Sequence, residues 1–95
     1  MSSTNYKIAG RLDATTSSAH RLAIQELLSG DVESIDLDLS GLVYVSSAGL
    51  RVLLLAAKAA KQKGVGLSLI DAKPQVLEVL RLTGLIPPPS AKASP

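Results

Sequence analysis

The sequence predicts a small α/β domain on three observations. Residues 35–39, Ile-Asp-Leu-Asp-Leu, alternate strictly between apolar and acidic side chains, as in a strand with one buried face. Three segments, 18–28, 47–63 and 74–83, space their apolar residues as amphipathic helices do. Strand-forming runs separate these helices and give the order β–α–β–α–β–α. That order favours a mixed or parallel sheet with right-handed crossovers.

The first strand and the first helix occupy the N-terminal third of the chain. Residues 6–12 alternate loosely and are predicted to form a strand. The hydroxyl-rich residues 13–18 can cap the helix that follows. In that helix the apolar residues gather on one side: Ala23, Ile24, Leu27 and Leu28. The single histidine, His20, lies on the same side, which favours a packed or hydrogen-bonded histidine over a general base.

The second and third helices follow short strands. An apolar run at 42–45 leads into the helix at 47–63. The predicted core stripe of this helix consists of Leu50, Leu53, Leu54, Ala57 and Ala60. A second face carries Arg51, Leu55, Lys58 and Gln62. A strand at 65–70 then precedes the helix at 74–83, and its Pro74 suits a first helical turn.

The length of 95 residues allows one domain with one hydrophobic core. We expect a flexible N-terminus at 1–5, the domain itself at 6–86 and a disordered proline-rich tail at 87–95. The prolines at 87–89 lack the amide donor that a strand inside a sheet needs. The chain has no cysteine, which excludes disulfides and thiolate metal sites and agrees with a reducing compartment.

Composition and charge argue against several classes of function. The net charge of +2 is small and the basic residues form no run with aromatics between them, so no nucleic-acid partner is expected. The longest unbroken apolar stretch, Val52–Ala57, is far shorter than the roughly 20 residues that span a bilayer, so no membrane insertion is expected. The N-terminus lacks the basic region and apolar core of a secretory signal, which predicts a cytoplasmic protein.

Catalytic chemistry is hard to assemble from this sequence. It has no glycine-rich phosphate loop with a lysine and no nucleophile elbow. Asp36 and Asp38 share one strand face, but a divalent cation usually needs more oxygen ligands. Ser46 and Ser47 have no base nearby in the sequence to activate them. We therefore expect a protein-binding module without a metal or a cofactor, and not an enzyme.

Ser46 and Ser47 stand where a strand ends and a helix begins. A serine at this position can cap the helix by accepting a hydrogen bond from an amide of the first turn. The surrounding segment, Leu42–Leu54, also resembles the signature of STAS domains, particularly anti-sigma factor antagonists. Three further segments match that family in the same order: Gly10–Asp13, Ile35–Ser40 and Leu80–Leu85.

The resemblance implies a STAS-like α/β fold, a small mixed sheet with helices packed on it, in which the family's C-terminal strand and helix are missing. The family's phosphorylatable serine falls on Ser47. Where the family has an aspartate before it and a serine or threonine after it, this chain has Ser46 and Ala48. Asp13 matches an acidic position expected near that serine. The implied partner-binding residues are Asp13, Ser46, Ser47, Ala48, Arg51 and Leu55.

The same resemblance implies a switch in transcription regulation. An unphosphorylated antagonist binds an anti-sigma factor that is also a serine kinase, and so frees the sigma factor. Phosphorylation by that kinase releases the antagonist, and a serine phosphatase restores it. The alternative is a non-phosphorylated STAS accessory subunit of a transporter or signalling complex. An exposed apolar surface at the position of the missing helix would favour a homodimer or a larger partner.

Overall fold

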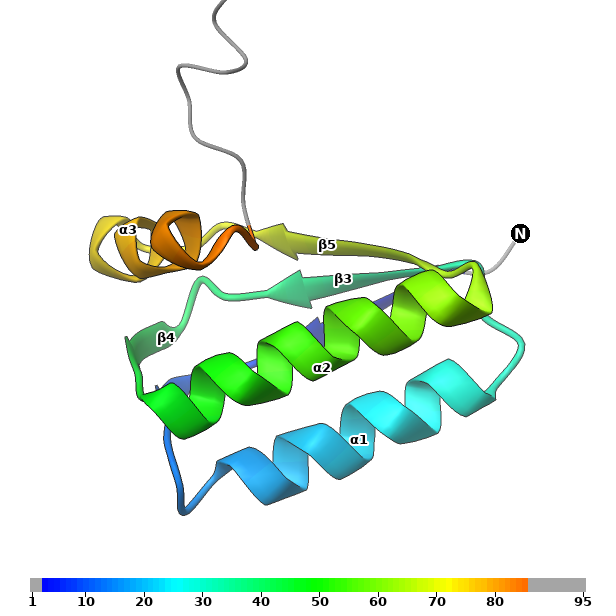
Figure 1. The fold of residues 1–95 in the computed structure, drawn as a ribbon, viewed down its shortest axis with the longest axis horizontal. Coiled ribbons are helices and arrows are strands. Elements are labelled where there is room, and N and C mark those ends of the chain that lie inside the picture. The colour runs from blue at the N-terminus through cyan, green and yellow to red at the C-terminus, as the bar shows by residue number, and fades with distance from the viewer. Residues whose placement is uncertain (1–2, 86–95) are drawn as a thin grey trace, which may run out of the picture.

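The computed structural model describes residues 3–85 and shows two helices side by side over one face of a sheet, with a third helix at the end of the sheet (Figure 1). The elements are β1 (Ser3–Lys7), β2 (Gly10–Leu12), α1 (Ser17–Ser29), β3 (Ser34–Asp38), β4 (Leu42–Val45), α2 (Ser47–Lys63), β5 (Gly66–Ile70) and α3 (Pro74–Thr83). The three predicted helices are confirmed, two of them at the predicted bounds. The tail expected at 87–95 lies outside the described residues.

The strands form two sheets, one with the order β1-β3-β5 and one that pairs β2 with β4. In the larger sheet Leu37 of β3 lies between Tyr6 of β1 and Leu69 of β5. Every pairing among the described strands is parallel, which is one of the two arrangements that the order of the elements favoured; the family resemblance implied a mixed sheet. Paired strands are joined by connections that include a helix, and such crossovers bring the chain back in the same direction.

The N-terminal strand differs from the prediction in its start and its continuity. It begins at Ser3, so residues 3–5 belong to β1 and not to a flexible terminus. The segment predicted as one strand at 6–12 is divided between β1 and β2. Gly10 has a φ of 76°, a left-handed conformation that glycine adopts without strain. Its amide donates to the carbonyl of Gly41 at 2.8 Å, so the chain leaves β3 here and pairs with β4.

The core lies between the helices and the sheet. Ile35, Leu37 and Leu39 are fully buried, while Asp36 and Asp38 point to the opposite face, which confirms the alternation predicted for this strand. The other buried apolar side chains come from all parts of the domain: Ile8, Leu12, Ile24, Leu28, Leu42, Val52, Leu53, Ala56, Ala60, Val76 and Leu80.

The buried stripe of α2 is displaced from the predicted one. Its buried residues are Gly49, Val52, Leu53, Ala56 and Ala60. Leu54, expected in the core, is 45% exposed. The apolar residues of α2 are spread over most of its circumference, so their spacing alone does not show which face is buried. The face that is buried carries Gly49, which lets the start of the helix approach Leu12 of β2 closely.

Two polar groups singled out in the sequence have structural partners. His20 is half-buried, and its Nδ1 lies 2.7 Å from the hydroxyl of Tyr6, which supports the hydrogen-bonded interpretation. The carboxylate of Asp38 accepts a hydrogen bond of 2.9 Å from the amide of Ser40. That bond lowers the pKa of Asp38 and fixes the turn after β3. In residues 3–85 no group of three His, Cys, Asp or Glu side chains is placed to hold a metal ion.

Candidate protein-binding site at the start of α2

Ser46 fixes the first turn of α2. Its backbone is extended, and its hydroxyl oxygen accepts a hydrogen bond of 3.2 Å from the amide of Gly49. Its own amide donates to the carbonyl of Leu12 at 2.9 Å. One serine therefore caps α2 and ties the start of the helix to the end of β2.

Gly49 brings α2 and β2 into direct contact. A Cβ atom built on Gly49 would overlap the carbonyl oxygen of Leu12 and lie 2.8 Å from the Cγ of Leu12. No side chain fits in that space without a shift of the backbone. The start of α2 is thus held in position by backbone contact and by the Ser46 hydrogen bonds.

Ser47, the first residue of α2, is exposed. Its hydroxyl makes no hydrogen bond to any other residue within 3–85. Since Ser46 caps the helix, the hydroxyl of Ser47 is available at the surface beside the free amides of the first turn. The sequence left the two serines equivalent as caps, and the structure shows that Ser46 is the cap and Ser47 is not.

Asp13 lies directly after Leu12 of β2, the residue whose carbonyl accepts the amide hydrogen bond of Ser46 at the start of α2. Its carboxylate accepts hydrogen bonds from the hydroxyl of Thr15 at 2.7 Å and from the amide of Thr15 at 3.0 Å. These bonds, assisted by Arg11, lower the pKa of Asp13 to about 2. Asp13 is therefore ionised at neutral pH, with an ion pair of 3.2 Å to the Nε of Arg11.

The loop between β2 and α1 is held by its own hydrogen bonds. The hydroxyl of Thr16 donates to the carbonyl of Arg11 at 2.8 Å, and the amide of Ser17 donates to the carbonyl of Asp13 at 2.8 Å. We expected a hydroxyl from this segment to cap α1, but the cap residue, Thr16, makes no side-chain capping bond. The backbone carbonyl of Asp13 instead accepts the hydrogen bond from the first amide of α1, that of Ser17.

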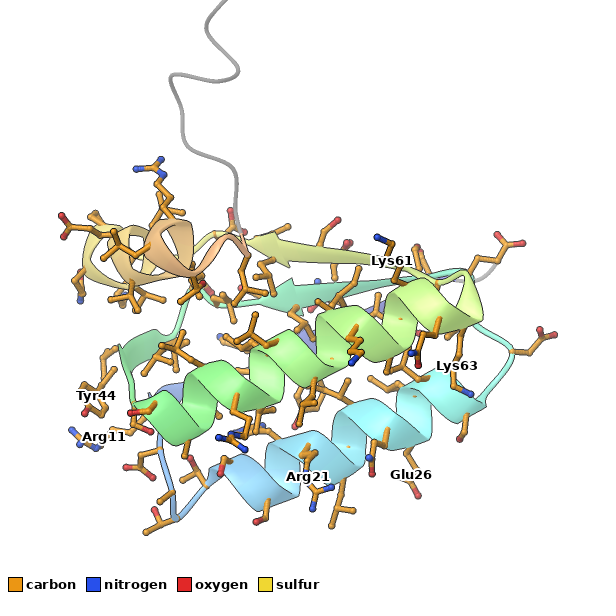
Figure 2. All side chains as sticks on the ribbon, in the orientation of Figure 1. Arg11, Arg21, Glu26, Tyr44, Lys61 and Lys63 are labelled. Atoms are coloured by element: carbon orange, nitrogen blue, oxygen red, sulfur yellow. The ribbon has the colours of Figure 1, made fainter. Side chains whose placement is uncertain are left out.

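Arg11 and Tyr44 are two residues of this region that the sequence did not single out. They lie opposite each other on β2 and β4, and the guanidinium of Arg11 is 4.2 Å from the centre of the Tyr44 ring (Figure 2). Tyr44 is 43% exposed, so this cation–π pair forms part of the surface. One signal was present in the sequence, because Tyr44 is one of only two aromatic residues.

The structure separates the predicted partner-binding residues into two places. Ser46, Ser47 and Ala48 lie together at the start of α2, and Arg51 follows one turn later with an exposed side chain. Leu55 is 48% exposed but lies farther along α2, where it lines a groove shared with α1. Leu55 is therefore a neighbour of α1 and not part of the first turn of α2.

Comparison with known proteins identifies the class to which this fold and site belong. A family model described as "Mlab, STAS domain" matches residues 2–86. The chain belongs to the STAS domain family, which confirms the family and the STAS-like α/β fold that the motifs implied. No helix within residues 3–85 is long and apolar enough to cross a membrane.

Two curated relatives are similar in sequence over most of the chain. The putative anti-sigma factor antagonist BtrV of Bordetella bronchiseptica is 38% identical over 79 residues, which cover 79% of this chain and 68% of that protein. An anti-sigma F factor antagonist of Paenibacillus polymyxa is 34% identical over 80 residues, covering 83% of this chain and 68% of that protein.

Solved structures show how widely the fold is shared. Unphosphorylated SpoIIAA, an anti-sigma factor antagonist, superposes with a TM-score of 0.78 at 22% identity, covering 90% of this chain and 76% of that chain. An anti-sigma factor antagonist from Mycobacterium paratuberculosis gives 0.71 at 26% identity, covering 83% and 67%. The STAS domain of a SulP transporter from Vibrio cholerae gives 0.71 at 13% identity, covering 87% and 64%.

Proposed function

We propose that this chain is a regulatory protein of the anti-sigma factor antagonist type. It binds an anti-sigma factor that is a serine kinase, and phosphorylation of Ser47 by that kinase releases it. A serine phosphatase then restores the binding form. The names of the two curated relatives support the general role.

The observation that carries the proposal is the structural difference between the two serines. Ser46 caps α2, whereas Ser47 is exposed and its hydroxyl has no partner among the described residues. A kinase can therefore modify Ser47 without removing the cap or opening the core. The docking surface of this proposal comprises Asp13, Ser46, Ser47, Ala48 and Arg51.

Phosphorylation at this position would change surface charge and not the fold. The positive end of the α2 dipole and the free amides of its first turn accommodate a phosphate on Ser47. The phosphate adds roughly −1.5 to −2 charges. This charge would repel an acidic partner surface and would raise the cost of desolvating the interface with an apolar one.

The test uses the full chain and an anti-sigma factor kinase that is purified by affinity to the immobilised chain. With ATP, wild type and Ser46→Ala should each gain the mass of one phosphate, and Ser47→Ala should gain none. Ser47→Asp should fold normally and bind the kinase about tenfold more weakly or worse. A phosphate on another residue, or a Ser47→Asp protein that binds as tightly as wild type, would refute the switch.

A second candidate is a non-phosphorylated accessory subunit of a transporter or signalling complex. The name Mlab in the family description and the fold shared with a transporter STAS domain favour it. In that case Ser47 would stay unmodified, and Ser47→Asp would disturb the complex only through its fixed charge. Intact-mass measurement of the protein isolated from its own cells distinguishes the two candidates.

A further inference from the structure

A groove runs between α1 and α2 and is lined by side chains of both helices. The helices lie side by side and run in the same direction (Figure 1). The groove has a volume of about 220 Å³. Its apolar lining comes from both helices and consists of Ile24, Leu28, Val52, Leu55, Ala56 and Ala59.

The groove is hollow because its α2 wall is made partly of alanine. Ala56 and Ala59 face α1 with single methyl groups, and these leave space between the helices. Leu55 stands at the edge of this space and is 48% exposed. An apolar hollow of this size can receive one large apolar side chain of a partner, and the half-exposed Leu55 would pack against that side chain.

The charged groups of the lining are all basic. Arg21 of α1 and Lys58 of α2 line the groove, and Arg51 is exposed on the Leu55 side of α2, one turn before it. None of these three makes an ion pair with a carboxylate within residues 3–85. The only acidic residue of either helix is Glu26, which points away from α2 (Figure 2).

We propose that this groove binds an acidic amphipathic helix of a partner protein. One large apolar side chain of that helix fills the hollow at Leu55, and its flanking carboxylates pair with Arg21 and Lys58. A helix fits because the groove follows two parallel helices, and an amphipathic helix presents anchors at successive turns along such a groove. The groove is separate from the first turn of α2, so this proposal does not depend on phosphorylation of Ser47.

The probe is a fluorescein-labelled synthetic peptide of about 16 residues, which spans about 24 Å as a helix. It carries leucine and phenylalanine at helical spacing with glutamate on both sides of them. Its control has lysine in place of every glutamate. We expect the glutamate peptide to bind the full chain with a dissociation constant of about 100 µM or tighter, measured by fluorescence anisotropy, and to shift the amide resonances of groove residues.

Two double variants with the same net charge test the role of the groove charges. Arg21→Glu with Lys58→Glu should weaken binding about tenfold or more. Lys61→Glu with Arg81→Glu replaces exposed basic residues that do not line the groove, and it should change the affinity by no more than about twofold. Ala59→Leu, which occupies the hollow without changing charge, should weaken binding as well. Thermal melting checks that each variant folds.

Several results would overturn the proposal. These are no binding of the glutamate peptide, equal binding of the lysine peptide, or equal losses in the two double variants. Sodium dodecanoate tests the other occupant of similar chemistry, an anionic amphiphile. If dodecanoate shifts the groove resonances and the peptide does not, the groove is a lipid site and the inference of a protein partner is wrong.

Discussion

The start of α2 and the groove along its middle contain the same kind of small residue but are packed in opposite ways. Gly49 brings the helix so close to the carbonyl of Leu12 that no Cβ fits. Two turns later, Ala56 and Ala59 line a groove with about 220 Å³ of open space. A small residue therefore gives tight packing where a backbone faces it, and leaves a hollow where the neighbouring helix stands farther away.

The two regions also differ in charge. Near the start of α2 the carboxylate of Asp13 is paired with Arg11 at 3.2 Å, whereas the groove is lined by Arg21 and Lys58 with no carboxylate. A single helix thus presents a closely fixed surface at one end and an open basic surface along its side. Substitutions in the two regions should therefore have different effects.

The largest effect is expected for Gly49→Ala. The new methyl group must displace the backbone of β2 or α2, and overpacking of this kind costs about 2 kcal/mol or more. The gain in helix propensity, about 1 kcal/mol, is too small to offset it. Urea unfolding measures the loss. Gly30→Ala is the control, because its nearest neighbour is an ordinary contact at 3.6 Å and its stability should stay within about 0.5 kcal/mol of wild type. Equal stability of both variants would show that the contact at Gly49 is not tight.

The helix ends were predictable because they depend on local chemistry. Gly64 and Gly84 end α2 and α3 with φ values of 72° and 83°, which only glycine adopts readily. Pro74 begins α3 as its fixed φ allows. The apolar run at 42–45 correctly placed the strand that leads into α2.

Other features could not be predicted because they depend on relations between elements. Adjacent serines are equivalent as caps in the sequence, and only the extended backbone of Ser46 decides between them. The pairing of Arg11 with Tyr44 requires the register of β2 with β4, which includes an irregularity after Gly10. The groove depends on the distance between α1 and α2, and the spacing of apolar residues in the sequence does not predict that distance.

The next effect in size separates the two serines. Ser46→Ala removes the cap of α2 and should cost about 1 kcal/mol of unfolding free energy. Ser47→Ala removes an exposed hydroxyl that has no partner among the described residues, so its cost should be within about 0.5 kcal/mol. Thermal melting of both variants makes the measurement. A larger loss for Ser47→Ala than for Ser46→Ala would contradict the assignment of the cap.

A pH titration tests how the charge of Asp13, near the start of α2, is stabilised. The pKa of Asp13 falls from 3.8 to about 2 on folding, because Thr15 donates two hydrogen bonds to the carboxylate. Its contribution to stability is therefore complete above about pH 4 and disappears as the pH falls through about 2. Carboxyl NMR should give a midpoint for Asp13 well below that in Thr15→Ala. If Thr15→Ala leaves the midpoint unchanged, the hydrogen bond from the Thr15 hydroxyl does not control this charge.

The smallest effect on stability is expected in the groove. Ala59→Leu adds three carbon atoms to a half-buried position that faces open space, so nothing need move to receive them. The added apolar contacts with Leu28 and Leu55 offset the side-chain entropy that is lost, and the unfolding free energy should change by no more than about 0.5 kcal/mol. Gly49→Ala adds a single carbon to the same helix and should destabilise it several times more. Parallel urea titrations of the two variants provide the comparison. If Ala59→Leu is as destabilising as Gly49→Ala, the groove is already closed in solution, and it cannot receive an anchor side chain from a partner.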